Sequence, residues 1–440
     1  MGMKKKSNKE LKKEILEKIV ALHKLKGSRP TKAEFVSAGL SDHQIRKFFG
    51  GWNVAFEEAV DLEGTLKSSE TIITNKYRSL ARSIQRKNVL QDYEIANLTE
   101  EFAKSIKNLK LNPLVLNKKE IKNYLKKIKA PSAEKRELVA LLCDWHLGLR
   151  VDNSEVGNSN KFSWVEGCRR CAFYAQEIAN YKITHRASTK KLHLAGLGDI
   201  NHGKIHNTTG IDTDLIVHQM NGALHVLYHM ISYLLNFFDE IVFYGIPGNH
   251  EDWPFRREGG NRVNQQKYDS VINPIYYALS LIFAGRVKFV IPKTQYVMID
   301  TIGGRLMGVH GDTVFSAIQG PSKSINFKTL THQIESFNTG EIKKGHPPIA
   351  GVLAGHVHQE LKAKTQNGID VVVNSTLSGL DPFANSLSIN YAIASQTIIE
   401  STKNHPCGDI RRVQFSKEVD NNKELDKIIP IYDLELDYKK

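Results

Sequence analysis

Histidine, asparagine and acidic residues follow five short apolar runs of this chain, and several of them are residue types that bind metal ions. The runs are followed in order by "CDWHLG", "GDINHG", "GNHED", "HGD" and "GHVHQ". Carboxylate and imidazole side chains are common ligands of divalent cations. A single Asp-x-His after a strand is usually ordinary loop chemistry, but five such loops in order are not independent accidents. We therefore predict that they contribute to one metal site.

The apolar runs themselves predict an α/β domain. They cover residues 138–143, 191–197, 240–246, 305–310 and 349–354, and they alternate with amphipathic stretches such as 214–238. Short apolar runs between helical patterns are typical of buried strands. Loops at the carboxyl ends of strands in such sheets converge on the binding crevice. The five loops are therefore expected to meet.

The order of the motifs resembles the calcineurin-like metallophosphoesterase superfamily, whose pattern reads D-x-H, G-D, G-N-H-[DE], H and G-H-x-H. The resemblance implies a four-layer α/β/β/α sandwich with two divalent metals between the sheet edges. It also implies the ligands. One metal would be held by Asp144, His146, Asp199 and His358, and the other by Asp199, Asn249, His310 and His356, with the Asp199 carboxylate as the bridge.

Two neighbouring cations suit the hydrolysis of a phosphate ester. Cations about 3.5–4 Å apart clamp both oxygens of an in-line displacement, and they lower the pKa of water so that a hydroxide held between them is the expected nucleophile. The mixed ligand set favours Mn²⁺, with Fe, Zn and Mg as alternatives, over Ca²⁺. His250 lies next to a ligand. We predict that it assists the leaving group, with Glu251 or another carboxylate orienting its ring.

A second histidine, His202, follows Asp199 by three residues. This spacing resembles the SbcD-type DNA double-strand-break repair nucleases, in which a histidine at that place contacts the substrate phosphate. Asn201 is closer to the phosphodiesterase and phosphatase pattern, and a supporting or surface role for His202 is equally open. Residues 374–400 resemble the closing segment of phage-encoded metallophosphoesterases. We predict that His202 positions the phosphate.

The positive charge of the chain is concentrated in its first third. The whole chain has 61 Lys and Arg against 47 Asp and Glu, a formal net charge of +14. Residues 1–130 hold 28 basic and 15 acidic residues, which leaves 33 basic and 32 acidic residues in the rest. This asymmetry favours contact between the first third and a polyanion. A solvated, Lys-rich set of helices is the alternative.

Short helices around a small core are predicted at the N-terminus. Residues 9–25 have helical spacing, and two capping boxes are predicted, at Thr31 with Glu34 and at Ser41 with Gln44. Two short helices joined by a glycine-containing turn make an all-α, helix-turn-helix-like domain.

The stretch "FGGWNVAFEEA" at 49–59 is similar to the pattern FG-x-W-N-x-A-x-E-A, with a doubled glycine before Trp52. With it, residues 28–62 resemble the homing-endonuclease-associated repeat, a small helical DNA-binding unit. The second short helix, at 41–49, is expected to face DNA. Its candidate DNA-binding residues are His43, Gln44, Arg46 and Lys47.

We expect four segments along the chain. They are a helical DNA-binding module (1–63), a basic helical connector (64–135), a metallophosphoesterase domain (136–400) and a C-terminal extension (401–440). The oligomeric state stays open, a homodimer included.

The composition predicts a cytoplasmic protein without contact to a membrane, in the bacterial host if the protein is phage-encoded. No uninterrupted apolar stretch reaches roughly 18 residues, and the N-terminus lacks the apolar region of a secretory signal. The four cysteines are too few for a disulfide scaffold. Cys168 and Cys171 form a CxxC, which we interpret as a coincidence on a helix surface.

These features together predict a two-metal phosphodiesterase that acts on DNA, a nuclease. A phosphatase or small-molecule phosphodiesterase with a basic localisation region is the first alternative. A DNA-binding regulatory protein with an inactive phosphoesterase scaffold is the second, but it gives no reason to retain the whole ligand set.

Overall fold

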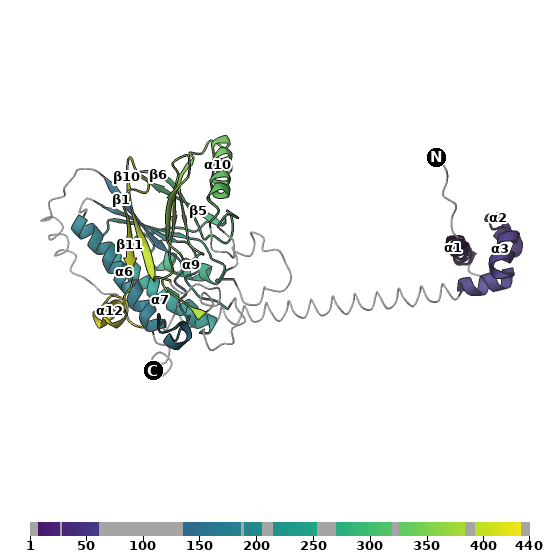
Figure 1. Cartoon of the computed structure of the whole chain (residues 1–440), viewed down its shortest axis with the longest axis horizontal. Helices are drawn as coiled ribbons and strands as arrows, with labels where there is room; N and C mark the ends of the chain where they lie inside the picture. The colour runs from purple at the N-terminus through teal and green to yellow at the C-terminus, as the bar shows by residue number, and fades with distance from the viewer. Residues whose placement is uncertain are drawn as a thin grey trace. The chain divides into compact units, whose positions relative to one another are not determined.

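The computed structural model describes most of the chain, in two units (Figure 1). The described residues are 8–26, 29–60, 135–185, 189–204, 214–252, 270–318, 325–382 and 392–432. The units are Met1–Ala96 and Asn97–Lys440. Apart from Lys135, the predicted connector at 64–135 lies outside the described residues. No helix within the described ranges is long and apolar enough to cross a membrane.

The first unit consists of short helices around one apolar core. The helices are α1 (Asn8–Lys26), α2 (Lys32–Ser37), α3 (Asp42–Phe49) and a further helix over 52–60. Ile19, Phe35 and Ile45 lie in the core. The rings of Phe35 and Trp52 stack with centroids 5.0 Å apart, so Trp52 has the packing role expected of it.

One of the two predicted capping boxes is present. The Thr31 hydroxyl accepts the Glu34 N–H, and the Glu34 carboxylate accepts the Thr31 N–H. The prediction for Ser41 is wrong, because its side chain makes no capping hydrogen bond. Gly50 ends α3 in the left-handed conformation, with a φ of 77°.

The second unit is built on two facing β-sheets. The first sheet has the order β11-β10-β1-β2-β3-β4, and the second has the order β5-β6-β7-β9-β8. The first sheet contains β1 (Arg136–Leu142), β2 (Lys191–Gly196), β3 (Glu240–Gly245), β4 (Lys288–Val290), β10 (Ser395–Thr402) and β11 (Ile410–Gln414). The second contains β5 (Tyr296–Thr301), β6 (Gly304–Val309), β7 (Ile349–Ala354), β8 (Leu361–Lys364) and β9 (Asp370–Val373).

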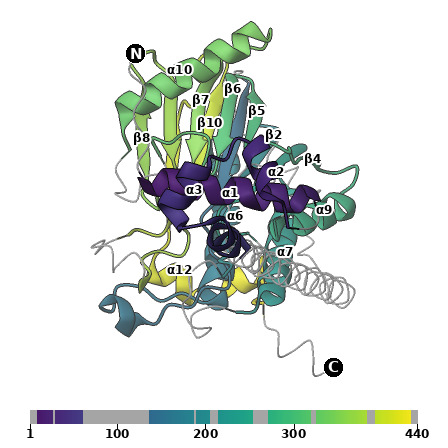
Figure 2. The same cartoon turned by 90° about the vertical axis from the view of Figure 1, so that its right-hand side faces the viewer.

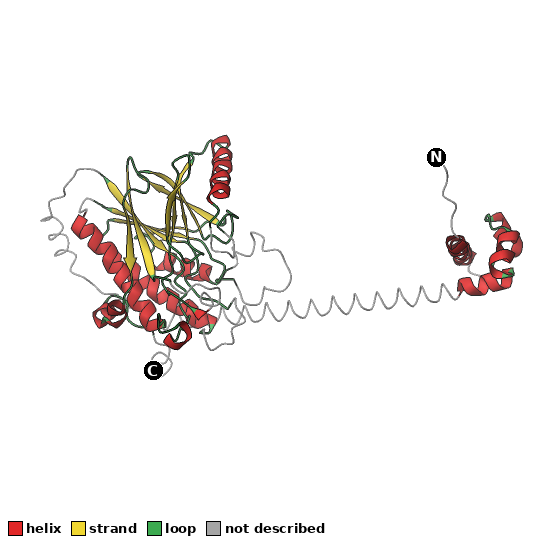
Figure 3. Cartoon of the chain, in the orientation of Figure 1, coloured by secondary structure: helices red, strands yellow, loops and turns green. Residues whose placement is uncertain are grey.

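Helices cover the outer faces of both sheets, so the unit is the predicted four-layer α/β/β/α sandwich (Figures 2 and 3). The first sheet is covered by α6 (Trp164–His185), α7 (Ile216–Leu234) and α9 (Ile272–Ile282), followed at the end of the chain by α12 (Lys417–Asn421). The second sheet is covered by α10 (Phe327–Lys343). Leu141, Leu197 and Leu353 belong to the core between the sheets. Two short 3-10 helices, η1 (Asn153–Val156) and η2 (Lys423–Lys427), complete the unit.

All five strands expected from the apolar runs are present, as β1, β2, β3, β6 and β7. The expected boundary between residues 400 and 401 falls inside β10, which pairs with β1 on one side and β11 on the other. The described part of the expected extension therefore belongs to the same sheet and helical layer. Cys168 and Cys171 are both fully buried on α6, so their expected place on a helix surface is wrong.

A buried histidine on α7 makes the stability of this unit depend on pH. His229 is 2% exposed, and neither of its ring nitrogens has a hydrogen-bond partner within the described part of the chain. Its ring centroid lies 4.5 Å from that of His225. Burial, reinforced by the charge of His225, lowers the pKa of His229 to about 3.

We expect the free energy of unfolding to fall as the pH drops below 6.5, the ordinary pKa of histidine. In that range the unfolded chain binds a proton at His229 and the folded chain does not, which costs about 1.4 kcal/mol per pH unit. Urea unfolding at pH 6.5 and at about pH 5 measures how much the free energy of unfolding falls between the two conditions. This fall should be smaller for His229→Leu than for the wild type. The matched variant His332→Leu, at an exposed position on α10, should keep the full loss. Equal losses in both variants would contradict this assignment.

Candidate metal centre

The predicted ligand loops leave the two sheets at the ends of strands that lie in register. In the first sheet, Leu142 of β1 pairs with Gly196 of β2, which pairs with Gly245 of β3. In the second sheet, β6, β7 and β9 are parallel, and Ala354 pairs with Val373. The loops that begin at these ends carry Asp144, His146, Asp199, Asn249, His310, His356 and His358. The register therefore brings together loops from distant parts of the sequence.

One group of ligand atoms is formed by Asp144, His146 and His358. The Nε2 atoms of His146 and His358 are 2.9 Å apart, and Asp144 Oδ1 lies 3.5 Å from His358 Nε2. The possible ligand atoms of this group all lie within 4.8 Å of one another. Three of the four ligands expected for the first metal therefore converge.

A second group is formed by Asp144, Asp199 and His310. His310 Nε2 lies 3.1 Å from Asp199 Oδ2. The Asn249 amide oxygen lies 2.9 Å from the same His310 nitrogen and 3.0 Å from Nδ1 of His356. All four ligands expected for the second metal thus lie in contact. The carboxylate common to both groups is Asp144, whereas the bridging role of Asp199 stays a prediction.

The backbone of these loops is strained. Five expected ligands have a positive φ: Asp144 (55°), His146 (50°), Asp199 (55°), His356 (72°) and His358 (55°). Residues other than glycine rarely adopt this conformation, which costs roughly 1–3 kcal/mol each and persists where the surrounding structure enforces it. Neighbouring glycines leave room for the carboxylates, because a Cβ at Gly248 or Gly355 would overlap Asp199 or Asp144. Such a concentration of strain is typical of functional sites.

The buried carboxylates of the centre have opposite electrostatic environments. Burial raises the pKa of Asp144 to about 7, with His310 opposing and Asp199 reinforcing the shift. Burial also opposes the ionisation of Asp199, but the positive charge of His310 holds the pKa of Asp199 well below its usual range. Asp199 in turn, against the effect of burial, raises the pKa of His310 to about 9. Strong mutual perturbation of this kind marks a candidate functional site.

The residues present fit a pair of divalent cations. Asp199 Oδ2 is buried and makes no hydrogen bond of good geometry among the described residues; its close neighbour is His310 Nε2 at 3.1 Å, and a bound cation would complete the balance of its charge. Imidazole nitrogens, carboxylate oxygens and one amide oxygen form a donor set that suits Mn²⁺, Fe²⁺ or Zn²⁺. The donor set does not select one of these metals.

His250 and His202 form a third group with His146, and the possible ligand atoms of this group also lie within 4.8 Å of one another. His250 Nδ1 donates to the carbonyl oxygen of His202 at 2.7 Å, so its ring is oriented by a carbonyl, and acid–base chemistry at this residue falls to Nε2. His202 Nδ1 lies 3.3 Å from Nδ1 of His146. If His146 presents Nε2 to a cation, its Nδ1 carries the hydrogen and His202 Nδ1 must accept it. His202 then presents a protonated Nε2, which is suited to donate to a phosphate oxygen.

Glu251 accepts hydrogen bonds from backbone N–H groups, whereas the sequence suggested that it orients the ring of His250. It is fully buried. One carboxylate oxygen accepts the N–H groups of Ile200 and Asn201 at 2.9 and 3.3 Å, and the other accepts that of Gly248 at 2.8 Å. The carboxylate therefore joins the Asp199 loop to the Asn249 loop.

Two supporting residues were not predicted from the sequence. Gln219 on α7 accepts the Gly203 N–H at 2.7 Å and donates to the carbonyl of Asp214 at 2.8 Å, which holds the loop that carries His202. The Thr376 hydroxyl donates to the Asp144 carbonyl at 2.9 Å. Neither residue lies in a motif, so only their proximity in the fold reveals them.

The candidate DNA-binding residues lie in the other unit, on α3. His43, Arg46 and Lys47 are exposed and Gln44 is partly buried. Arg46 is paired with Asp42 at 3.1 Å. Asp42 also accepts the Trp52 indole N–H, so this charge pair is anchored to the core of the unit.

Comparison with known proteins yields structural similarity alone. No family model matches the chain, and no curated protein does. Similar solved structures include a dimetal phosphatase from Danio rerio, with 10% identity, a TM-score of 0.34, and coverage of 64% of this chain and 99% of that one. The sulfate thiohydrolase SoxB from Thermus thermophilus has 9% identity, a TM-score of 0.29, and coverage of 68% and 60%. A 5'-nucleotidase from Candida albicans has 12% identity, a TM-score of 0.31, and coverage of 70% and 57%. These values are too low to transfer an activity.

Replacement of Glu251 should weaken metal binding without removing a ligand. In Glu251→Gln an NH₂ group replaces one oxygen and meets a backbone N–H, so the two loops lose part of their connection. Because changes to groups that support ligands typically cost 10–100-fold in affinity, we expect the Kd for Mn²⁺ to rise by roughly that factor. Isothermal titration calorimetry measures it. Glu424→Gln, at an exposed position on η2, is the matched control; equal affinities of the two variants would argue against the role of Glu251.

Proposed function

We propose that the chain is a metal-dependent phosphoesterase. The observation that carries this proposal is the pair of adjoining ligand groups that share Asp144, with Asn249 and His356 completing the contacts. Two bound cations would supply Lewis-acid activation of a phosphoryl oxygen and of water. As predicted from the sequence, Asp144, His146, Asp199 and His358 would hold one of them, and Asp199, Asn249, His310 and His356 the other.

The remaining residues are assigned to the substrate. His202 donates from Nε2 to a phosphate oxygen and so orients the ester. His250, held by its Nδ1 contact with the His202 carbonyl, delivers a proton from Nε2 to the leaving oxygen. Because that carbonyl belongs to the backbone of His202, the hydrogen bond holds the His250 ring against the loop that carries His202.

DNA is the substrate that we propose, so the reaction would be that of a nuclease. The proposal is supported by the positive charge of residues 1–130 and by the exposed basic side chains on α3. Basic side chains on one helix suit contacts to phosphates. A phosphatase or small-molecule phosphodiesterase is the second candidate, because the metal ligands alone do not distinguish a phosphate monoester from a diester. An inactive scaffold would show no turnover of any ester.

Activity assays should separate these functions. With Mn²⁺, the protein is expected to cleave linear duplex, single-stranded or plasmid DNA as well as bis(p-nitrophenyl) phosphate, and to lose activity with EDTA or in Asp199→Asn. His250→Ala should slow DNA cleavage by roughly 10²–10⁴-fold, but the nitrophenyl ester much less, because nitrophenolate leaves without a proton. His332→Ala serves as the control. Turnover of p-nitrophenyl phosphate with DNA left intact would reject the nuclease, and equal slowing of both diesters would reject His250 as proton donor.

The contribution of α3 is tested by the salt dependence of DNA binding. Removing two phosphate contacts in the double variant Arg46→Gln/Lys47→Gln should reduce the slope of log K against log salt by about 2. Fluorescence anisotropy with the full-length chain and EDTA measures this slope without cleavage. Lys13→Gln/Lys18→Gln removes the same charge from exposed positions on α1. If the two double variants have the same slope, α3 is not the contact surface.

A further inference from the structure

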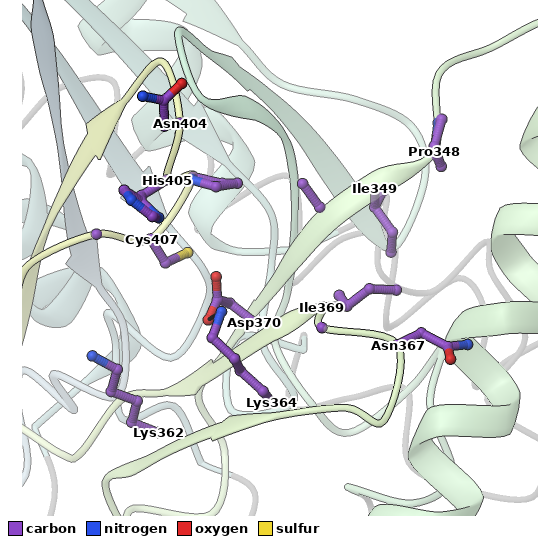
Figure 4. Close-up of a pocket in the computed structure, with 14 residues that line it drawn as sticks. Pro348, Ile349, Lys362, Lys364, Asn367, Ile369, Asp370, Asn404, His405 and Cys407 are labelled. Carbon is purple, nitrogen blue, oxygen red and sulfur yellow. Dashed lines mark ion pairs between the residues drawn. The ribbon is translucent and has the colours of Figure 1, made fainter.

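A cavity lies where β7 and β9 begin, at the end of the β-sandwich opposite the metal centre, and Figure 4 shows the residues that line it. Its volume is about 690 Å³, and it is lined by the starts of β7 and β9, the end of β8 and the turn between β10 and β11. β7 begins in the cavity wall at Ile349 and runs to Ala354, after which the chain enters the loop of His356 and His358. None of the expected metal ligands lines the cavity.

The cavity wall carries more positive than negative charge. Lys362 and Lys364 of β8 line it together with Asp370 of β9. Asp370 is 4% exposed and forms an ion pair with Lys364 at 2.6 Å. Lys362 is exposed, and no acidic group of the described chain lies within ion-pair distance of it. One ammonium group is thus neutralised, and the other is available to an anion.

The opposite wall offers polar and apolar surface. Figure 4 shows Asn404, His405 and Cys407 on the turn between β10 and β11, with the Cys407 sulfur directed toward Asp370. Pro348, Ile349, Ile369 and Pro406 add apolar lining. The cavity therefore has a cationic side for a charged group and an apolar surface for the body of a ligand.

We propose that this cavity binds a small organic phosphate of about mononucleotide size. Small-molecule sites typically enclose roughly 300–1,000 Å³, with mainly apolar walls and a few polar groups. The ammonium group of Lys362 would bind the phosphate as a point charge, as lysine commonly does. Lys364 is paired with buried Asp370, so its ammonium group can donate a hydrogen bond to the phosphate but adds no net charge. The proposal is independent of the phosphoesterase function, because the two sites share no residue.

Calorimetry with AMP, adenosine and inorganic phosphate tests the proposal. The full-length protein is titrated in EDTA, so that phosphate binding to metal ions does not contribute. We expect saturable binding of AMP, and binding at least about tenfold weaker for adenosine, which lacks the charge, and for phosphate, which lacks the apolar body. Equal affinity for AMP and adenosine, or no saturable binding of AMP, would overturn the proposal.

Three variants locate the binding. Lys362→Gln should lower AMP affinity by about tenfold, and Asn404→Trp should block the cavity from an exposed turn. Lys403→Gln removes the same charge from a neighbouring position that does not line the cavity, and should bind AMP like the wild type. If AMP binds both cavity variants as tightly as the wild type, the cavity is not its site. If the AMP affinity of Lys403→Gln falls as much as that of Lys362→Gln, AMP is attracted to the basic surface in general, which also excludes the cavity. Thermal melting confirms that each variant is folded.

Discussion

Buried negative charge at one edge of the sandwich is the constraint on which this domain depends. Asp144 and Asp199 are 0% and 1% exposed, and their carboxylates lie in one group with His310. Two carboxylates that are buried and close together repel each other strongly, because no water lies between them to screen their charges. Such a pair is stable only when positive charge balances it. His310 offsets part of this charge, and bound cations would offset the rest. The imidazoles and the single amide supply further donors without adding negative charge.

The structure around the centre offsets the cost of its strained loops. Glu251 joins two of the loops through three backbone N–H groups, and Thr376 and Leu377 both donate to the carbonyl of Asp144. Arg170, 3% exposed, donates to the carbonyls of Leu377 and Ser378 and pairs with Asp420 of α12. The end of the chain is thereby connected to the Asp144 loop. Buried, fully paired networks of this kind rigidify a structure, which explains how ligands with positive φ are maintained.

Chemistry and substrate choice are separate properties of this protein. In the proposed function, bound cations would act on the phosphoryl group, which monoesters and diesters share. Selectivity must come from contacts to the rest of the substrate, for which the basic helices of the first unit are the candidates. The cavity beside Lys362 lies at the other end of the sandwich, where an occupant would not compete for the metal ligands. The proposed functions can therefore be examined independently.

The sequence by itself determined the features that depend on neighbouring residues. Strands such as 349–354 could be predicted because apolar side chains must be buried. The ligand loops could be predicted because each of them directly follows such a strand. The Thr31 capping box depends on residues only three positions apart and is equally local. The tertiary structure alone decided the missing cap at Ser41, the place of β10 beside β1, and the support from Gln219 and Glu251. These features depend on contacts between residues far apart in the chain, and no local pattern encodes such contacts.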